Sequence, residues 1–338
     1  MDRKTVGVLV SMLLIITVIL PAMGTANVSC KNKLNECNNS LSDDIPIWEV
    51  GDKWSYRMDD INVNYDGGNI SASVHGKINN LAFTVLDAST GSYQLGYKAE
   101  IDGEFAIDLE EASIKVTGEL GRLIATKIEG DIFVRKSDLG IERITTYLSG
   151  VLRVKVLEQH IVPFSLPAIM APARITLSLD TDNPIVPINF PLSIGKTWHF
   201  QPMNISLDGE IKSVWLNRIK LIDNIAGLFG IELIPPELAK FLPVIDIGGF
   251  LNDFSNGNEF EIPDDFTQYV IFNVSKEEDI TVEAGTYHAY NITLPEGLGC
   301  LYYAPEVGNI IKISFRPDES VIPYFPYLSM ELIETNYD

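Results

Sequence analysis

The chain has 338 residues, of which 25 are Lys or Arg and 46 are Asp or Glu, so its formal net charge is -21. A surface of this sign repels phosphate backbones and anionic lipid head groups, which excludes nucleic acid as a partner. The sequence contains no spacing typical of a zinc site, a nucleophile elbow, a phosphate loop or a dinucleotide fold. No catalytic residue, metal or cofactor is therefore expected.

The first residues have the order of an export signal. A charged start is followed by an apolar run over residues 6–20 and by small residues up to Ala26. This order predicts a signal peptide over residues 1–26 and a secreted or extracytoplasmic protein. Two alternatives remain open, an uncleaved membrane anchor and a lipid on Cys30. Either one would hold the protein at the outer face of the cytoplasmic membrane and would be its only membrane contact.

A polar segment over residues 27–45 carries two of the three cysteines. In an oxidising compartment Cys30 and Cys37 are the local candidates for a disulfide, and Cys300 is then left over. If Cys30 carried a lipid, a bond between Cys37 and Cys300 would become available instead.

Residues 46–158 alternate between apolar and polar side chains, for example at every second position from Tyr93 to Ile101. A period of two is typical of half-buried strands, so this region is predicted to form a first antiparallel β unit. Asp102 and Gly103 separate two alternating runs, and such pairs favour tight turns, so a hairpin is expected there.

Residues 159–189 are rich in proline, which fixes φ and lacks the backbone donor that a central strand needs. We therefore expect a connection, or an irregular sheet edge, and place a domain boundary in this segment.

After this segment the chain repeats an earlier pattern, because Gly195-x-x-Trp198 matches Gly51-x-x-Trp54. A similar but weaker match joins residues 91–95 to residues 285–289. The repetition predicts a second β unit over residues 190–338. The expected fold is mainly β, with two tandem antiparallel β units that are curved sheets or half-barrels.

The second unit carries a predicted helical insertion over about residues 213–254. Its apolar residues recur at spacings of three and four, which is the period of an amphipathic helix. They are Trp215, Ile219, Ile222 and Phe229. This face either caps its own sheet, covers an apolar ligand, or lies on a membrane, and these four residues are the candidate ligand contacts.

Sequons for N-linked glycans occur at several positions, and in an exported protein they are candidate modification sites. They begin at Asn27, Asn38, Asn69, Asn204, Asn273 and Asn291, of which the last five are the glycosylation candidates.

In the last third, one strand ends in Ala-Gly-aromatic at residues 284–287, and the pattern Tyr-Tyr-x-Pro-x-Val-Gly follows at residues 302–308. With these patterns the last third resembles a family of uncharacterised exported β domains of bacteria and archaea. The resemblance implies an extracytoplasmic antiparallel β fold and no activity. Read without the family, Ala284-Gly285 and residues 305–308 are turns of two hairpins.

These observations together favour a non-enzymatic extracytoplasmic protein that binds an apolar ligand or a partner in the cell envelope. The alternatives are a structural component of the cell surface and a secreted hydrolase that uses carboxylates, because acidic residues are abundant.

Overall fold

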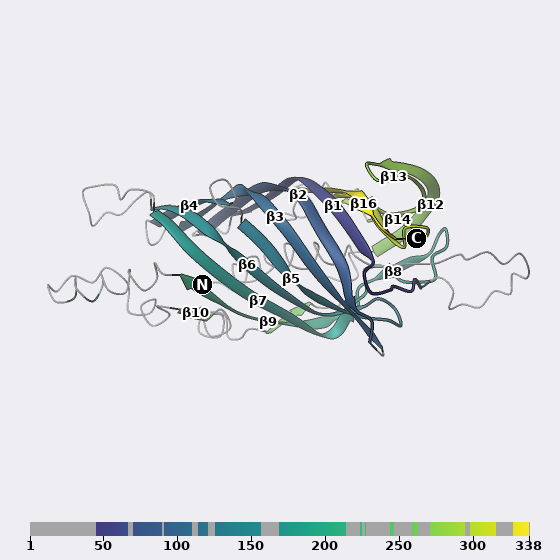
Figure 1. Ribbon diagram of the computed structural model, residues 1–338, viewed down its shortest axis with the longest axis horizontal. Helices are drawn as coiled ribbons and strands as arrows, with labels where there is room; N and C mark the ends of the chain where they lie inside the picture. Colours follow the sequence, from purple (N-terminus) through teal and green to yellow (C-terminus); the bar gives the residue numbers. More distant parts are fainter. Residues whose placement is uncertain are drawn as a thin grey trace, which may run out of the picture.

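A computed structural model describes residues 45–66, 70–89, 91–109, 114–120, 126–156, 169–213, 224, 227, 244–246, 259–262, 271–294, 298–315 and 327–337. Within these ranges the protein is mainly β, and its strands pair antiparallel in one large sheet (Figure 1). The alternating sequence explains this sheet, because every second residue turns towards the interior.

The strands fall into two groups along the chain. The first group is β1 (Lys53–Asp66), β2 (Ile70–Asp87), β3 (Ser92–Leu109), β4 (Ile114–Leu120), β5 (Thr126–Arg135), β6 (Ile141–Val156) and β7 (Ile169–Ile185). The second group is β8 (Thr197–His199), β9 (Met203–Ser213), β10 (Val244–Asp246), β11 (Glu259–Ile262), β12 (Ile271–Val282), β13 (Gly285–Thr293), β14 (Gly299–Ala304), β15 (Asn309–Phe315) and β16 (Tyr327–Thr335).

Among the described residues the sheet is continuous across both groups and does not close on itself. Its order is β10-β9-β7-β6-β4-β3-β2-β1-β16-β15-β14-β13-β12-β8, with β5 also between β3 and β6, and with β11 on β9. The pairing of β1 with β16 and the pairing of β7 with β9 join the two groups. β8 is the strand at one end of this order, and β9 lies next to the strand at the other end. Only residues 200–202 separate β8 from β9 in the sequence.

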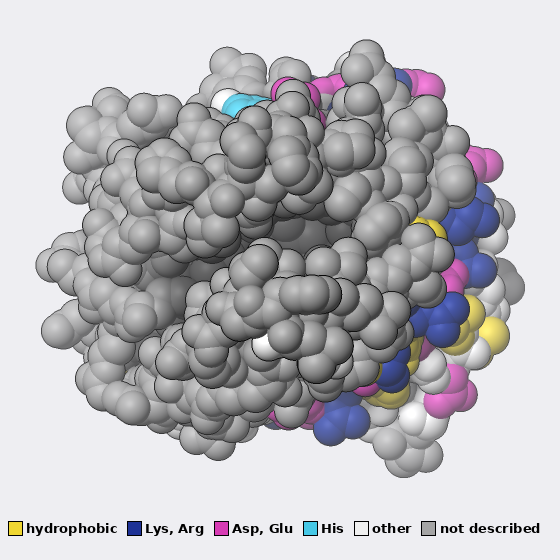
Figure 2. Space-filling view, turned by 90° about the vertical axis from the view of Figure 1, so that its left-hand side faces the viewer, with side chains coloured by type: hydrophobic (Ala, Val, Ile, Leu, Met, Phe, Trp, Pro, Cys, Tyr) yellow, Lys and Arg dark blue, Asp and Glu magenta, His cyan; other side chains and the backbone are white. Residues whose placement is uncertain are grey.

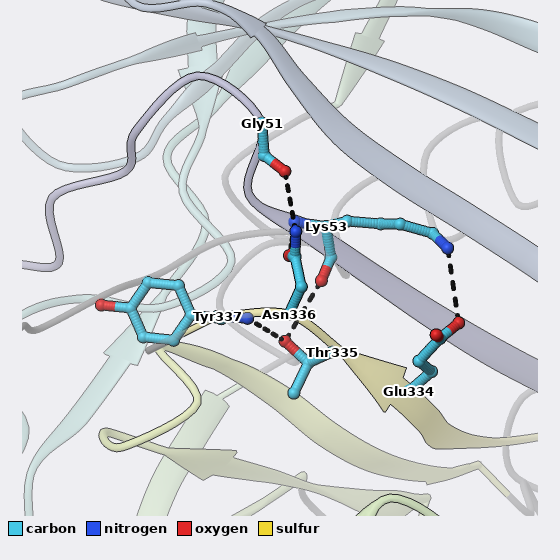
Figure 3. A network of polar contacts seen from close by, with 6 residues as sticks. All are labelled: Gly51, Lys53, Glu334, Thr335, Asn336 and Tyr337. Carbon is cyan, nitrogen blue, oxygen red and sulfur yellow. Dashed lines mark hydrogen bonds and ion pairs between the residues drawn. The ribbon is translucent and has the colours of Figure 1, made fainter.

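Polar contacts hold the C-terminal strand to the start of β1 (Figure 3). The Lys53 backbone N–H donates to Asn336 Oδ1 at 2.7 Å, and Asn336 Nδ2 donates to the Gly51 carbonyl at 3.1 Å. The Thr335 hydroxyl donates to the Lys53 carbonyl at 3.1 Å, and Lys53 Nζ pairs with Glu334 at 3.3 Å. Residues that are far apart in sequence are thereby fixed at one end of the sheet.

One hydrophobic core draws residues from both groups. Among its fully buried members are Trp54, Tyr56, Phe83, Leu95, Ile132, Tyr303 and Leu332. Trp54 connects the groups directly, because its indole N–H donates to the Val307 carbonyl, in the turn between β14 and β15, at 3.2 Å. The core therefore binds the two halves of the chain into one folded body.

Asp102 and Gly103 do not form the expected hairpin, since β3 runs through both residues without a break. Gly103 instead allows β2 and β3 to approach each other closely. A Cβ atom at this position would lie 2.4 Å from the His75 carbonyl oxygen and 2.8 Å from the Gly76 Cα atom on β2. A glycine in a strand pattern can mark such an approach as well as a turn.

The proline-rich segment is more than a connection, because it contains β7, which pairs with β6 on one side and β9 on the other. The expectation that this segment lies outside the central sheet is therefore wrong. Pro172 and Pro184 lie within the bounds of β7. Because proline removes only its own backbone donor, the neighbouring residues still form the ladder.

The two hairpin turns expected near the C-terminus are confirmed. Glu283 and Ala284 form the turn between β12 and β13, and residues 305–308 form the turn between β14 and β15.

Both Gly-x-x-Trp segments open a strand in the same way. Gly51 N–H donates to the Val85 carbonyl at 2.9 Å, and Gly195 N–H donates to the Val274 carbonyl at 2.8 Å. Both glycines have positive φ, 103° and 85°. The side chains at corresponding positions are Trp54 and Trp198, each opposite a phenylalanine on the neighbouring strand, Phe83 and Phe272.

The irregular positions of the ladders also correspond. A register shift follows Val85 on β2 and Val274 on β12, and another precedes Val134 on β5 and Tyr303 on β14. The turns that follow β5 and β14 each contain a backbone bond of 2.9 Å from a residue with positive φ. These residues are Leu139, bonded to Arg135, and Gly308, bonded to Ala304.

The weaker sequence match does not fall on corresponding positions. Val85 pairs with Leu95 and Val274 pairs with Ile292, so Leu95 corresponds to Ile292 rather than to Ala289. The hairpin of β12 and β13 is longer near its turn than the hairpin of β2 and β3. Gly285 therefore lies farther from Ile292 along the chain than Gly91 lies from Leu95.

The two groups differ in strand length. β2 and β3 have 18 residues each, β6 has 16 and β7 has 17, whereas β13 has 9, β14 has 6 and β15 has 7. In Figure 1, β12 to β16 gather at the right, while β3, β4, β6 and β7 extend to the left beyond them. The described strands of the second group are therefore shorter than the interior face that the longer strands of the first group present.

Candidate functional site

The interior face of the first group and of β9 can be followed in four rows. Row A is Val85, Leu95, Ile132, Ile144, Leu179 and Leu207, and row B is Phe83, Tyr97, Gly130, Thr146, Leu177 and Gly209. Row C is Leu81, Ala99, Ile128, Leu148 and Ile175, and row D contains Ile78, Ile101 and Gly150. Every position in these rows holds an uncharged residue.

Burial decreases from row A to row D. On β3 the exposed fraction rises from 0% at Leu95 to 8% at Ile101. On β6 and β7 the change is larger, because Leu148, Gly150 and Ile175 are only half-buried although the rows before them are buried. These three residues form the open apolar face, which is the candidate site.

Row B closes the core at the base of the open apolar face. The Tyr97 hydroxyl lies 2.6 Å from Thr146 Oγ1, and it also donates to the Thr145 carbonyl at 3.3 Å. Burial raises the pKa of Tyr97 well above its ordinary value, so the phenol stays protonated. The ring lies against Gly130, where a Cβ atom would be only 2.8 Å from it. The Tyr97 and Thr146 hydroxyls are hydrogen-bonded to each other, so neither is unpaired at the base of the open apolar face.

The ladder beneath the open apolar face is regular. The pairing of β6 with β7 runs without a register shift from Arg143 opposite Asp180 to Val154 opposite Ile169. The outward positions of the same strands are mostly polar and include the ion pair between Arg143 and Asp180. Figure 2 views the molecule from this end, where Lys and Arg side chains lie beside Asp and Glu on the described part of the surface.

A polar cluster lies on the outside of the hairpin of β12 and β13. His288 Nδ1 is 2.8 Å from Asp279 Oδ1, and its Nε2 is 3.4 Å from Glu277 Oε2. The hydrogen bonds to Asp279 and then Glu277 raise the pKa of His288, so it keeps its proton to higher pH. The cluster is exposed, and no group of three metal ligands occurs among the residues that the structure describes. It resembles a surface ion-pair network more than a reaction centre.

Several predicted site residues lie outside the described residues. These are Trp215, Ile219, Ile222 and Phe229, the cysteines Cys30 and Cys37, and the sequons at Asn38 and Asn69. Of the insertion, only Ser213, Asn224, Gly227 and the short strand β10 are described. The third cysteine, Cys300, is a half-buried free thiol on β14.

The three described sequons have different surroundings. Asn204 is exposed on β9, where its Nδ2 bonds to Asp182 at 2.7 Å, and Asn273 is half-buried on β12. Asn291 is only 7% exposed, and its Nδ2 donates to Glu278 Oε1 at 2.9 Å and to the Tyr302 hydroxyl at 3.3 Å. A glycan on that nitrogen would have to displace both partners.

We therefore expect a glycan on Asn204 and none on Asn291 when the folded protein is secreted from a host that modifies such sequons. The burial of the Asn291 amide is the reason. Peptide mass spectrometry measures the occupancy, with Asn204→Gln as the control that removes one glycan mass. A folded, secreted protein with a glycan on Asn291 would contradict the expectation.

The sequence did not single out Leu148 and Ile175. The alternation on β6 and β7 predicts that both residues face inward, but alternation carries no signal for how completely an inward residue is covered.

Comparison with family models, with curated proteins and with solved structures found no match. Within the described part of the chain, no helix is long and apolar enough to cross a membrane.

Proposed function

We propose that this protein is an exported, non-enzymatic binding protein that holds an apolar ligand, or an apolar part of an envelope partner, on the open apolar face. The observation that carries the proposal is the decrease in burial along rows A to D. Leu148 and Ile175 occupy interior positions of a regular ladder, yet they are only partly buried, unlike the residues before them. Complete burial of a large aliphatic side chain contributes about 1.5 to 3 kcal/mol relative to full exposure, so a bound apolar group that covers the part still exposed would gain a fraction of this.

The surroundings support binding rather than catalysis. The rows contain no charged residue, and the Tyr97 and Thr146 hydroxyls at their base are already bonded to each other. Sites for small molecules are mostly apolar with few polar groups. An export signal over residues 1–26 would place this face outside the cytoplasm, in contact with envelope components.

Replacing Leu148 with aspartate is expected to weaken the binding of an apolar fluorophore roughly tenfold or more, since an unpaired charge costs well over the 1.4 kcal/mol that corresponds to a factor of ten. The matched control is Tyr147→Asp, which places the same charge on the outer face of the same strand, where Tyr147 is 41% exposed. Fluorescence titration of delipidated protein measures binding, and circular dichroism checks that both variants fold.

Equal affinity in the folded Leu148→Asp variant and the control would reject the open apolar face as the site. Native mass spectrometry of the protein as purified gives an independent test. A co-purified lipid that disappears in Leu148→Asp alone supports the proposal. A structural component of the cell surface would carry no such ligand.

We also infer that the sheet consists of two related β units, the first from β1 to β7 and the second from β8 to β16. The support is the set of corresponding features already described, namely the two openings, the register shifts and the turns at Leu139 and Gly308. In this division β7 corresponds to β16, so the boundary falls after Ile185 and the proline-rich segment belongs to the first unit.

A further inference from the structure

We propose that the free edge of β12, residues 275–281, binds an extended basic segment of another polypeptide, which adds to the sheet as an antiparallel strand. This edge belongs to the hairpin of β12 and β13, whereas the open apolar face lies on β6 and β7, so the two proposals are independent. Unpaired backbone groups, a fixed position and the charge of the edge together support the assignment.

The side of β12 that faces away from β13 is paired only at its beginning. β8 pairs with β12 over residues 271–273 alone. One residue further, the Val274 N–H donates to the Lys196 carbonyl at 3.0 Å, and the Gly195 N–H donates to the Val274 carbonyl at 2.8 Å. The backbone groups of Val274 therefore point away from β13, towards the side that β8 occupies.

Three further residues direct their backbone groups to the same side. Alternate residues of an antiparallel strand do so, and the register shift after Val274 inserts one extra residue, so they are Glu277, Asp279 and Thr281. All three residues are exposed. Within the described ranges no backbone group bonds to them on this side. A row of unpaired N–H and C=O groups is a template for another strand.

The hairpin is held in place at its tip and along its other strand (Figure 1). At the tip, the Ala284 N–H donates to the Leu332 carbonyl of β16 at 3.2 Å, and the neighbouring Val282 is only 6% exposed. On β13, the His288 N–H donates to Glu306 Oε1, in the turn between β14 and β15, at 3.0 Å. The free edge is therefore in position before a partner arrives, which lowers the ordering cost of binding.

Charge on the free edge selects a basic partner. Glu277 and Asp279 lie on one face and share a single imidazole, that of His288, so this pair stays negative even when His288 is protonated. The Asp279 side chain remains accessible, with 74% of it exposed. On the same strand, Lys276 already pairs with Glu278 at 2.7 Å. Opposite charges at directly opposite positions stabilise paired strands, so Lys or Arg opposite Glu277 and Asp279 fits this edge.

A second copy of this chain fits the free edge poorly. Two identical strands that pair antiparallel about a two-fold axis place one residue opposite itself. With the axis at the middle of the edge, from residue 276 to residue 279, this residue is Lys276, Glu277, Glu278 or Asp279. Equal charges would then meet, which destabilises the pairing. The expected partner is therefore a different polypeptide.

The first test uses the purified protein and a fluorescein-labelled peptide, Thr-Val-Lys-Val-Lys-Val-Thr, whose lysines fall opposite Glu277 and Asp279 in the antiparallel register. Fluorescence anisotropy measures the affinity. Glu277→Lys is expected to weaken binding about five- to tenfold, because an attractive cross-strand pair becomes a repulsive one. The matched control is Glu129→Lys, which makes the same change of charge at an exposed position of β5 and should leave the affinity unchanged.

Methylation of the peptide backbone distinguishes strand addition from attraction to an acidic surface. Directly opposite residues that turn their backbone groups towards each other exchange both hydrogen bonds, so the lysine N–H groups face β12. N-methylation of the two lysines should therefore abolish binding, whereas N-methylation of the three valines should preserve it. Hydrogen exchange in residues 275–282 should also slow when the unmodified peptide binds.

Several results would overturn the proposal. They are no binding of the lysine peptide, equal binding of a peptide with glutamate in place of lysine, and equal affinities of the Glu277→Lys and Glu129→Lys proteins. Binding that survives methylation of the lysines would also overturn it, and this comparison uses the unchanged protein, so it does not depend on the folding of a variant.

Discussion

Replacing Trp54 with alanine is expected to lower the free energy of unfolding by about 3 to 5 kcal/mol, the range measured when large aromatic residues are removed from protein cores. Trp54 is completely buried, and its ring centroid lies 5.7 Å from that of Trp48 and 6.0 Å from that of Tyr337. Its indole N–H donates to the Val307 carbonyl. The substitution therefore opens a cavity and removes a contact between the two halves of the chain.

The matching tryptophan of the second opening separates these two contributions. Trp198 is also buried and stacks on Phe272 with ring centroids 5.3 Å apart, but its Nε1 has no acceptor among the described residues. Both Trp54→Phe and Trp198→Phe remove ring volume, and only Trp54→Phe removes a hydrogen bond. We expect the first to cost about 1 kcal/mol more than the second.

Urea denaturation followed by far-ultraviolet circular dichroism measures both substitutions, because it does not depend on the tryptophans that are replaced. Equal losses for Trp54→Phe and Trp198→Phe would show that the bond to Val307 adds nothing to stability. A loss below about 1 kcal/mol for Trp54→Ala would contradict the assignment of Trp54 to the core that joins the two halves.

Local patterns predicted much of the fold. The alternation of residues predicted the antiparallel strands, and the turn at residues 305–308 followed from Pro305 and Gly308. The hairpin at Gly103 was wrong because a glycine permits both a turn and the close approach of two strands. Only the pairing with His75 and Gly76 distinguishes these uses, and that pairing involves residues distant in sequence.

Predicting the candidate site requires knowledge of distant strand pairings to an even greater extent than predicting the fold. The sequence placed it in the insertion, at Trp215, Ile219, Ile222 and Phe229, which lie outside the described residues. The described candidate is instead on β6 and β7, and of these two strands only β7 lies in the proline-rich segment that was expected to be a connection. Alternation gives the face of a strand on which a residue lies. How much of that face is covered depends on the lengths of strands elsewhere in the chain.

The second large effect is expected at Gly130, where replacement with alanine should destabilise the protein by about 2 to 4 kcal/mol. Alanine in a strand is usually more favourable than glycine, so this substitution would ordinarily stabilise a protein. At Gly130 we expect it to destabilise the protein instead. The added Cβ atom would lie 1.9 Å from the Thr145 carbonyl oxygen and 2.8 Å from the Tyr97 ring. Overpacking of this kind typically costs about 1 to 3 kcal/mol.

A displaced Tyr97 would also lose its bond to Thr146, and a buried hydroxyl left without a partner adds about 1 to 3 kcal/mol. The matched control is Gly96→Ala on β3, whose Cβ atom would lie 2.6 Å from Leu86 Cδ1. Leu86 is 51% exposed and can turn away, so this variant should lose little stability. Thermal unfolding measures both variants. A Gly130→Ala protein as stable as Gly96→Ala would show that Tyr97 does not depend on the bare backbone at Gly130, and the floor of the open apolar face would then need a different explanation.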